Sequence, residues 1–161
     1  MAPCHGGWRG QAKKEGLHQT CAVTPNFTLK DLSGKAVRLS DFRGKVVLLD
    51  FWAAWCDSCL SAGPYYEKLH KRHGSSSFAM VGINEGERAK TVEAFVKKNN
   101  ITYPVLLDSN KEAFDACGIR GLPSAVLIDD EGKIRGRWAG FDDAAASNLE
   151  KSLNALLTKK P

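Results

Sequence analysis

Two cysteines separated by two residues, Cys56 and Cys59, form the pattern in this sequence that most directly implies chemistry. They follow a continuous apolar run, residues 46–52, and open a segment expected to be helical, which places them at a strand-to-helix junction. A helix N-terminus presents unpaired N–H groups and a partial positive charge, and both stabilise a thiolate and lower its pKa. The pattern predicts thiol–disulfide exchange, with Cys56 as the attacking thiolate and Cys59, one turn further and more buried, as the resolving thiol.

A lone pair of this spacing could also be half of a zinc site. No second such pair occurs, and His70 and His73 lie far along the same expected helix, so we expect no metal and no other cofactor. The remaining cysteines are Cys4, Cys21 and Cys117, and the odd total of five leaves at least one thiol free. We expect Cys117 to pack in the core and assign no catalytic role to the other two.

Composition describes one soluble globular domain. The chain has 161 residues, is 43% hydrophobic, and carries a formal charge of +5 without a block of Lys and Arg. No apolar run reaches the roughly 18–20 residues that span a bilayer, and no nucleic-acid-binding motif is present. Residues 1–20 lack the apolar region of an intact signal peptide. This leaves open a cytosolic protein or one from which an export signal or anchor has been removed.

The pattern of apolar residues and turn signals indicates an α/β protein. A hairpin at residues 26–39 comes first, and a helix from Cys56 to His73 is expected to be interrupted by Pro64. Strands are expected at residues 46–52, 78–83, 104–107, 124–128 and 133–138, and further helices at 87–99, at 110–117 and around Leu149, Leu153, Leu156 and Leu157. Strands and helices alternate and a hairpin and helix close the chain, which predicts a mixed sheet with helices on both faces.

The residues around the two cysteines and a later proline resemble those of a known family. Residues 49–59 (LDFWAAWCDSC) are similar to the thioredoxin active-site segment, and residues 121–124 (GLPS) to the loop that holds the family's cis-proline. Residues 27–35, residues 81–84 and residues 103–105 resemble the TlpA/ResA-like branch. The resemblance covers about residues 23–158.

The resemblance implies a thioredoxin fold: a central mixed sheet flanked by helices, with an N-terminal hairpin and a strand–helix insertion. It implies one domain at residues 23–161, preceded by a flexible tail or export-signal remnant at 1–22. It also implies a monomer that reduces or exchanges disulfides of protein substrates and is recharged by an upstream thiol reductant. Members often work in the periplasm or elsewhere outside the cytoplasm, often in cytochrome c maturation. An extracytoplasmic location is therefore expected, with the cytoplasm as the alternative.

The resemblance also implies roles for individual residues. Pro123 matches the cis-proline, which leaves the backbone of Leu122 free to pair with a substrate strand. Asp50 matches the buried acid of thioredoxin, so desolvation should raise its pKa and let it accept the Cys59 proton through water. Trp55 should offer a flat apolar contact surface beside the redox pair.

The chain departs from its relatives around that acid. ResA-like proteins often carry an amide at position 50 and a buried Glu three residues after the second cysteine, where this chain has Ala62. The lysine that neighbours the thioredoxin acid aligns with Gly82. These differences argue against importing a specificity for cytochrome apoproteins. Asp57, beside Cys56, opposes the thiolate and favours a reductant or a moderate exchanger over a strong oxidant.

Two other functions fit the sequence less well. A thiol peroxidase of the peroxiredoxin type carries Pro and Thr at fixed spacing before its cysteine, whereas residues 53–55 here are Ala-Ala-Trp. A carrier of copper or zinc would use both cysteines and a histidine brought near them by folding, but no histidine flanks the expected cis-proline loop.

Overall fold

The computed structural model describes residue 24 and residues 26–159 of the chain, so the expected tail at 1–22 lies outside the described residues. The elements are β1 (Thr28–Asp31), β2 (Ala36–Arg38), the 3-10 helix η1 (Leu39–Phe42), β3 (Val46–Trp52), α1 (Asp57–His73), β4 (Phe78–Glu85), α2 (Ala89–Lys98), β5 (Val105–Asp108), α3 (Glu112–Cys117), β6 (Ser124–Ile128), β7 (Ile134–Ala139) and α4 (Asp143–Thr158).

The strands form one seven-stranded mixed sheet in the order β2-β1-β5-β4-β3-β6-β7, which confirms the predicted fold class. The pairs β3–β4 and β4–β5 are parallel, and all other pairs are antiparallel. β3 lies between β4 and β6, and all seven of its residues are buried, as a continuous apolar run predicts for a strand covered on both faces.

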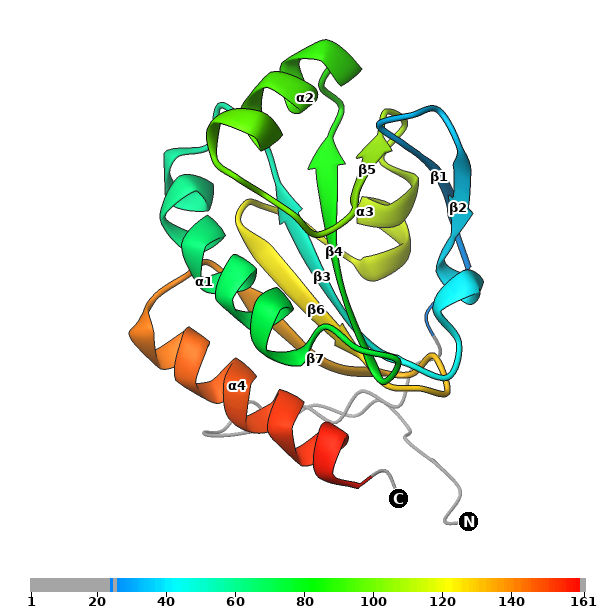
Figure 1. Ribbon diagram of the computed structural model, residues 1–161, viewed down its shortest axis with the longest axis vertical. Helices are drawn as coiled ribbons and strands as arrows, with labels where there is room; N and C mark the ends of the chain where they lie inside the picture. The colour runs from blue at the N-terminus through cyan, green and yellow to red at the C-terminus, as the bar shows by residue number, and fades with distance from the viewer. Residues whose placement is uncertain (1–23, 25, 160–161) are drawn as a thin grey trace, which may run out of the picture.

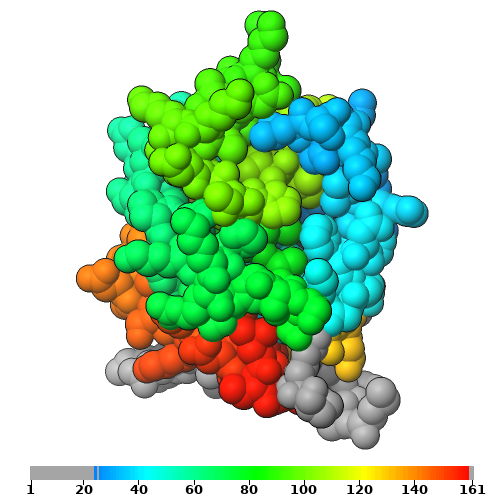
Figure 2. Space-filling model, viewed as in Figure 1, coloured from blue at the N-terminus to red at the C-terminus, as the bar shows by residue number. Residues whose placement is uncertain are grey.

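Successive side chains of β3 enter two different cores, because side chains alternate between the faces of a strand. Val46, Leu48 and Trp52 belong to the core that also contains residues of α1, α2 and α4. Val47, Leu49 and Phe51 belong to the second core, with residues of α3 and η1. Figures 1 and 2 show α1, α2 and α4 on the face of the sheet that is turned toward the viewer. By the same alternation, Asp50 lies on the face that α1 covers.

The N-terminal hairpin and the insertion predicted from the resemblance meet at one side of the sheet. β1 and β2 pair antiparallel around a turn in which Gly34 adopts a φ of +87°, a conformation that glycine tolerates best. β5, the strand that follows α2, pairs with β4 on one side and with β1 on the other. The inserted strand β5 therefore connects the hairpin to the central sheet.

Helix α1 differs from its expected form. It runs without interruption from Asp57 to His73 and carries Pro64 inside it. The carbonyl that loses its hydrogen bond to a proline belongs to the residue four positions earlier, here Leu60, a residue that is 40% exposed. None of the helices in the described part of the chain is both long and apolar enough to cross a bilayer.

Candidate active site

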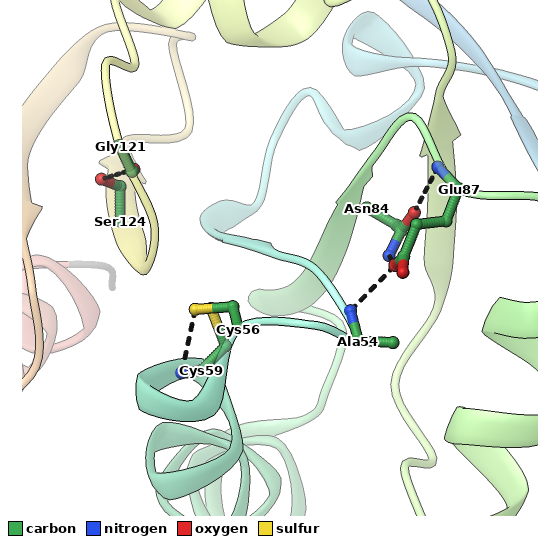
Figure 3. The surroundings of a disulfide bond; sticks show 7 residues. All are labelled: Ala54, Cys56, Cys59, Asn84, Glu87, Gly121 and Ser124. Atoms are coloured by element: carbon green, nitrogen blue, oxygen red, sulfur yellow. Dashed lines mark hydrogen bonds between the residues drawn. A yellow bond between two sulfur atoms is a disulfide. The ribbon is translucent and has the colours of Figure 1, made fainter.

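Cys56 and Cys59 are joined as a disulfide with their Cα atoms 5.3 Å apart. Cys56 is the N-cap of α1, and its Sγ accepts a hydrogen bond of 3.3 Å from the Cys59 N–H (Figure 3). The first sulfur therefore lies against the unpaired N–H groups of the helix, as predicted. Both cysteines are 7% exposed, so the expectation that Cys59 is the more buried is wrong. The two cysteines therefore differ in their positions on the helix and not in their exposure.

The loop before β6 lies at the same edge of the sheet as the redox pair. The Leu122–Pro123 peptide is cis, which confirms the prediction. Ser124 pairs with Phe51 near the end of β3, so the loop adjoins the segment that leads into Cys56 (Figure 3). Two hydrogen bonds hold the loop: the Ser124 hydroxyl donates to Gly121 O at 2.7 Å, and the Gly140 N–H donates to Pro123 O at 2.8 Å.

Two exposed apolar side chains flank the redox pair in the sequence. Trp55 is 66% exposed and Leu60 is 40% exposed, and these residues directly precede Cys56 and follow Cys59. Trp55 and Leu122 also line a hollow of about 340 Å³. Large exposed apolar side chains beside a reactive group are typical of a protein-binding surface. Leu60 was missed by the sequence analysis, although its position after Cys59 was a usable signal.

Asp50 lies within the core beneath α1. It is 4% exposed, and its Oδ2 accepts a long hydrogen bond of 3.5 Å from the Tyr103 hydroxyl. Among the described residues, Oδ1 has no hydrogen-bond partner. Burial raises the pKa of Asp50 from its ordinary value of 3.8 to about 7, and the Tyr103 hydrogen bond offsets part of that rise. The expectation of a desolvated acid with a raised pKa is confirmed.

The residue opposite Asp50 on β4 is Gly82, the position that the family resemblance paired with a lysine. A Cβ atom added at Gly82 would lie 3.0 Å from Trp52 Nε1 and 3.1 Å from a Tyr103 ring carbon. The two aromatic side chains thus occupy the space in which a longer side chain at position 82 would lie. Asp50 accordingly lies beside the aromatic side chain of Tyr103, with no lysine at the position opposite it.

A cavity of about 260 Å³ connects this acid with the redox pair. Asp50 and Cys59 both line it, together with Trp52 and Tyr103 on the sheet side. The exposed Asn100 also lines it, so the cavity reaches the surface between α1 and α2. Because a water molecule occupies about 30 Å³ of liquid, the cavity has room for several between the carboxyl group and Cys59.

The remaining sequence expectations concern other cysteines and metals. Cys117 is fully buried and unpaired in α3, as expected for a core residue, and burial raises the pKa of its thiol to about 12. Cys4 and Cys21 lie outside the described residues. Within residue 24 and residues 26–159, no three His, Cys, Asp or Glu side chains gather as a metal site requires.

Comparison with known proteins agrees with this geometry. The sequence model of the AhpC/TSA family matches residues 22–137. The thiol-disulfide oxidoreductase ResA of Bacillus subtilis is 39% identical over 110 residues, which are 68% of this chain and 62% of that protein. ResA of Bacillus cereus is 33% identical over 127 residues, 79% of this chain and 73% of that protein. The chain thus spans just under two thirds of the first of these relatives and more of the second.

A solved structure extends the similarity to the fold. A Chlorobium tepidum protein assigned as a thiol:disulfide interchange protein DsbE superimposes with a TM-score of 0.80 at 30% identity, over 86% of this chain and 97% of that one. The similarity includes the mixed sheet and helices described above, which form a thioredoxin fold. The chain therefore belongs to the AhpC/TSA family, on the thioredoxin-fold branch that contains the ResA thiol-disulfide oxidoreductases.

Proposed function

We propose that this chain is an enzyme that exchanges disulfides with protein substrates through Cys56 and Cys59. The observation that carries the proposal is the disulfide-bonded pair Cys56 and Cys59 at the N-terminus of α1. The cis-proline loop lies at the same edge of the sheet. A thiolate at such a helix end is stabilised by N–H groups, and a second thiol one turn away can complete the exchange.

The proposed reaction has two steps. The Cys56 thiolate attacks one sulfur of a substrate disulfide, forms a mixed disulfide and releases the first substrate thiolate. The Cys59 thiolate then attacks Cys56 Sγ, releases the second substrate thiolate and closes the Cys56–Cys59 disulfide. Two electrons pass to the substrate, and an upstream thiol reductant returns the enzyme to its dithiol form.

Asp50 is proposed to accept the proton that Cys59 must lose before the second step. Its pKa of about 7 matches this task, since a base works best when its pKa is near the working pH. Water in the cavity that both side chains line would carry the proton. Asp50 would therefore act on the resolving step more than on the first attack.

Trp55, Leu122 and Pro123 are proposed to hold the substrate. Trp55 offers an exposed aromatic surface, and Pro123 has no N–H, so an extended substrate segment could pair with the backbone of Leu122. We further propose a monomer that works outside the cytoplasm, where disulfide-containing proteins are common. The ResA relatives, thiol-disulfide oxidoreductases by name, support a role in redox homeostasis; cytochrome c maturation is the setting that the family resemblance implies, although the residues around Asp50 argue against a specificity for cytochrome apoproteins. Cell fractionation would test the location.

Replacing Cys59 with serine tests the proposed function directly. The Cys59→Ser variant keeps the attacking thiolate but cannot resolve the mixed disulfide, so it should accumulate a covalent adduct with a disulfide substrate such as insulin. The experiment is best made with Cys4→Ser and Cys21→Ser also present, so that Cys56 is the only accessible thiol. Mass spectrometry after non-reducing electrophoresis identifies the adduct. Full turnover by Cys59→Ser would contradict the assigned roles.

Truncation of Trp55 tests the substrate surface. Because the side chain is 66% exposed, Trp55→Ala should leave the unfolding free energy within about 0.5 kcal/mol of wild type. Loss of an aromatic anchor should raise the KM for a protein disulfide about tenfold, which corresponds to about 1.4 kcal/mol. Trp138→Ala is the matched control: that indole is half-buried and donates to Asn148 Oδ1, so stability should fall instead. An unchanged KM in Trp55→Ala would remove Trp55 from the surface.

A further inference from the structure

One hydrogen bond joins the connection after β4 to the segment that precedes Cys56, and two more hold the side chain that accepts it. Glu87 Oε2 accepts from the Ala54 N–H at 2.8 Å and from Asn84 Nδ2 at 2.7 Å (Figure 3). Asn84 Oδ1 in turn accepts from the Glu87 N–H at 3.2 Å. One carboxylate oxygen therefore links two chain segments that are 33 residues apart in sequence.

The parallel pairing of β3 and β4 brings these groups together. Trp52 and Asn84 form the last register pair of the two strands, so both chain segments leave the sheet at the same edge. Ala54 follows two residues later on one side, and Glu87 three residues later on the other. Asn84 is fully buried, which gives its side chain a fixed position from which to orient the Glu87 carboxylate.

The segment held by Glu87 determines where Cys56 lies. Only residues 53–55 separate the end of β3 from the N-cap of α1. Their side chains are two methyl groups, which make no hydrogen bonds, and the indole of Trp55, which is 66% exposed. The segment's other backbone bond is internal, from the Cys56 N–H to Ala53 O at 3.1 Å. Ala53 packs in the core, and Glu87 supplies a polar tie from the rest of the protein to this segment.

We infer that Glu87, oriented by Asn84, is a positioning residue that holds Cys56 against Cys59 and against the start of α1. This inference rests on the proposed disulfide exchange. A tethered segment keeps the two sulfurs close after reduction, so it favours closure of the disulfide. Loss of the tether lets the segment move, and the disulfide then forms less readily.

Three variants separate the tether from its charge. Glu87→Gln removes the charge but keeps an oxygen at the same reach, whereas Glu87→Asp keeps the charge and shortens the reach by one methylene. Glu87→Ala removes both. Glu93→Ala, which removes an acid from α2 outside this cluster, is the control for net charge.

The measurement is the equilibrium of the full chain with glutathione, in which two glutathione thiols reduce the Cys56–Cys59 disulfide and become one glutathione disulfide. Glu87→Ala and Glu87→Asp should make the enzyme disulfide about tenfold easier to reduce, about 30 mV in potential, while Glu87→Gln and Glu93→Ala stay near wild type. The rate of insulin reduction should fall about tenfold in the same two variants.

The outcomes distinguish this inference from the proposed function. A wild-type protein that does not reduce insulin would end the proposed function itself. An active wild type with an unchanged potential in Glu87→Ala and Glu87→Asp would overturn the positioning role alone. Equal shifts in Glu87→Gln and Glu87→Ala would also overturn it, because the charge rather than the tether would then set the potential. Should Glu87→Ala fail to fold, the comparison of Glu87→Asp with Glu87→Gln decides the question.

Discussion

Replacing Cys56 with serine is expected to reduce disulfide exchange to the uncatalysed background. A serine hydroxyl does not ionise near neutral pH and forms no bond of disulfide type, so no mixed disulfide can begin the reaction. Cys59 remains, but it lies within the first turn of α1 and not at the N-cap. The measurement is insulin reduction with dithiothreitol as donor, compared with the rate in the absence of protein.

The control for this variant is Cys117→Ala. Cys117 is fully buried and burial raises its pKa to about 12, so its thiolate is not available and turnover should be retained. Because Cys56 and Cys59 are equally exposed, the assignment of the nucleophile depends on the N-cap position alone. Activity that survives in Cys56→Ser but is lost in Cys59→Ser would show that the roles are reversed.

The central strands and the redox pair could be predicted from the sequence because each depends on local patterns. β3 has the predicted bounds, since a continuous apolar run of strand length favours a strand covered on both faces. β6 also has its predicted bounds, because the proline before it and the turn after it define both ends. The spacing of Cys56 and Cys59 and the apolar strand before them were sufficient to place the redox pair.

The first residues of helices were less predictable. They depend on distant hydrogen bonds and on local backbone conformation, and the sequence pattern shows neither. The sequence favoured a helix from residue 87, but α2 begins at Ala89 with Arg88 as its N-cap. The Glu87 side chain accepts from Ala54 and Asn84 and does not support a helical turn. Similarly, α3 begins at Glu112 and not at residue 110, because Lys111 adopts a left-handed conformation with a φ of +58°.

The surroundings of Asp50 could be predicted only in part. An acid within an apolar strand indicates a raised pKa, and this much was expected. Tyr103, which donates to Asp50, is 53 residues away in sequence, and the aromatic groups that fill the space beside Gly82 come from different strands and loops. Such contacts depend on the order of strands in the sheet. No local sequence pattern predicts that β5 lies between β1 and β4.

Asp50→Asn is expected to change both stability and the resolving step. A carboxyl group with a folded-state pKa of about 7 and an ordinary value of 3.8 binds its proton more tightly when folded. Ionisation therefore destabilises the fold progressively between about pH 4 and pH 7, and above pH 7 this cost reaches about 4 kcal/mol. Asparagine removes the cost but leaves an amide that is incompletely paired, so the net gain should be about 1–3 kcal/mol at pH 8. At pH 4.5 the gain should be absent, and urea unfolding at both values measures the difference.

The same variant should lose a pH-dependent inflection in kinetics. In the wild type, conversion of a preformed mixed disulfide to the Cys56–Cys59 disulfide should speed up through about pH 7, as Asp50 ionises and becomes able to accept the Cys59 proton. Asp50→Asn should resolve the mixed disulfide more slowly near neutral pH, without this inflection, while the first attack by Cys56 changes less. Rapid-quench measurement of each step separates the two.

Asp108→Asn is the matched control, because Asp108 is also fully buried with a pKa raised by burial, yet it lies at the end of β5 and accepts from the Phe114 N–H. Its replacement can alter stability but should leave the inflection of the resolving step in place. An Asp50→Asn protein that resolves at the wild-type rate across the pH range, with no gain in stability at pH 8, would show that Asp50 neither accepts the proton nor destabilises the fold when ionised.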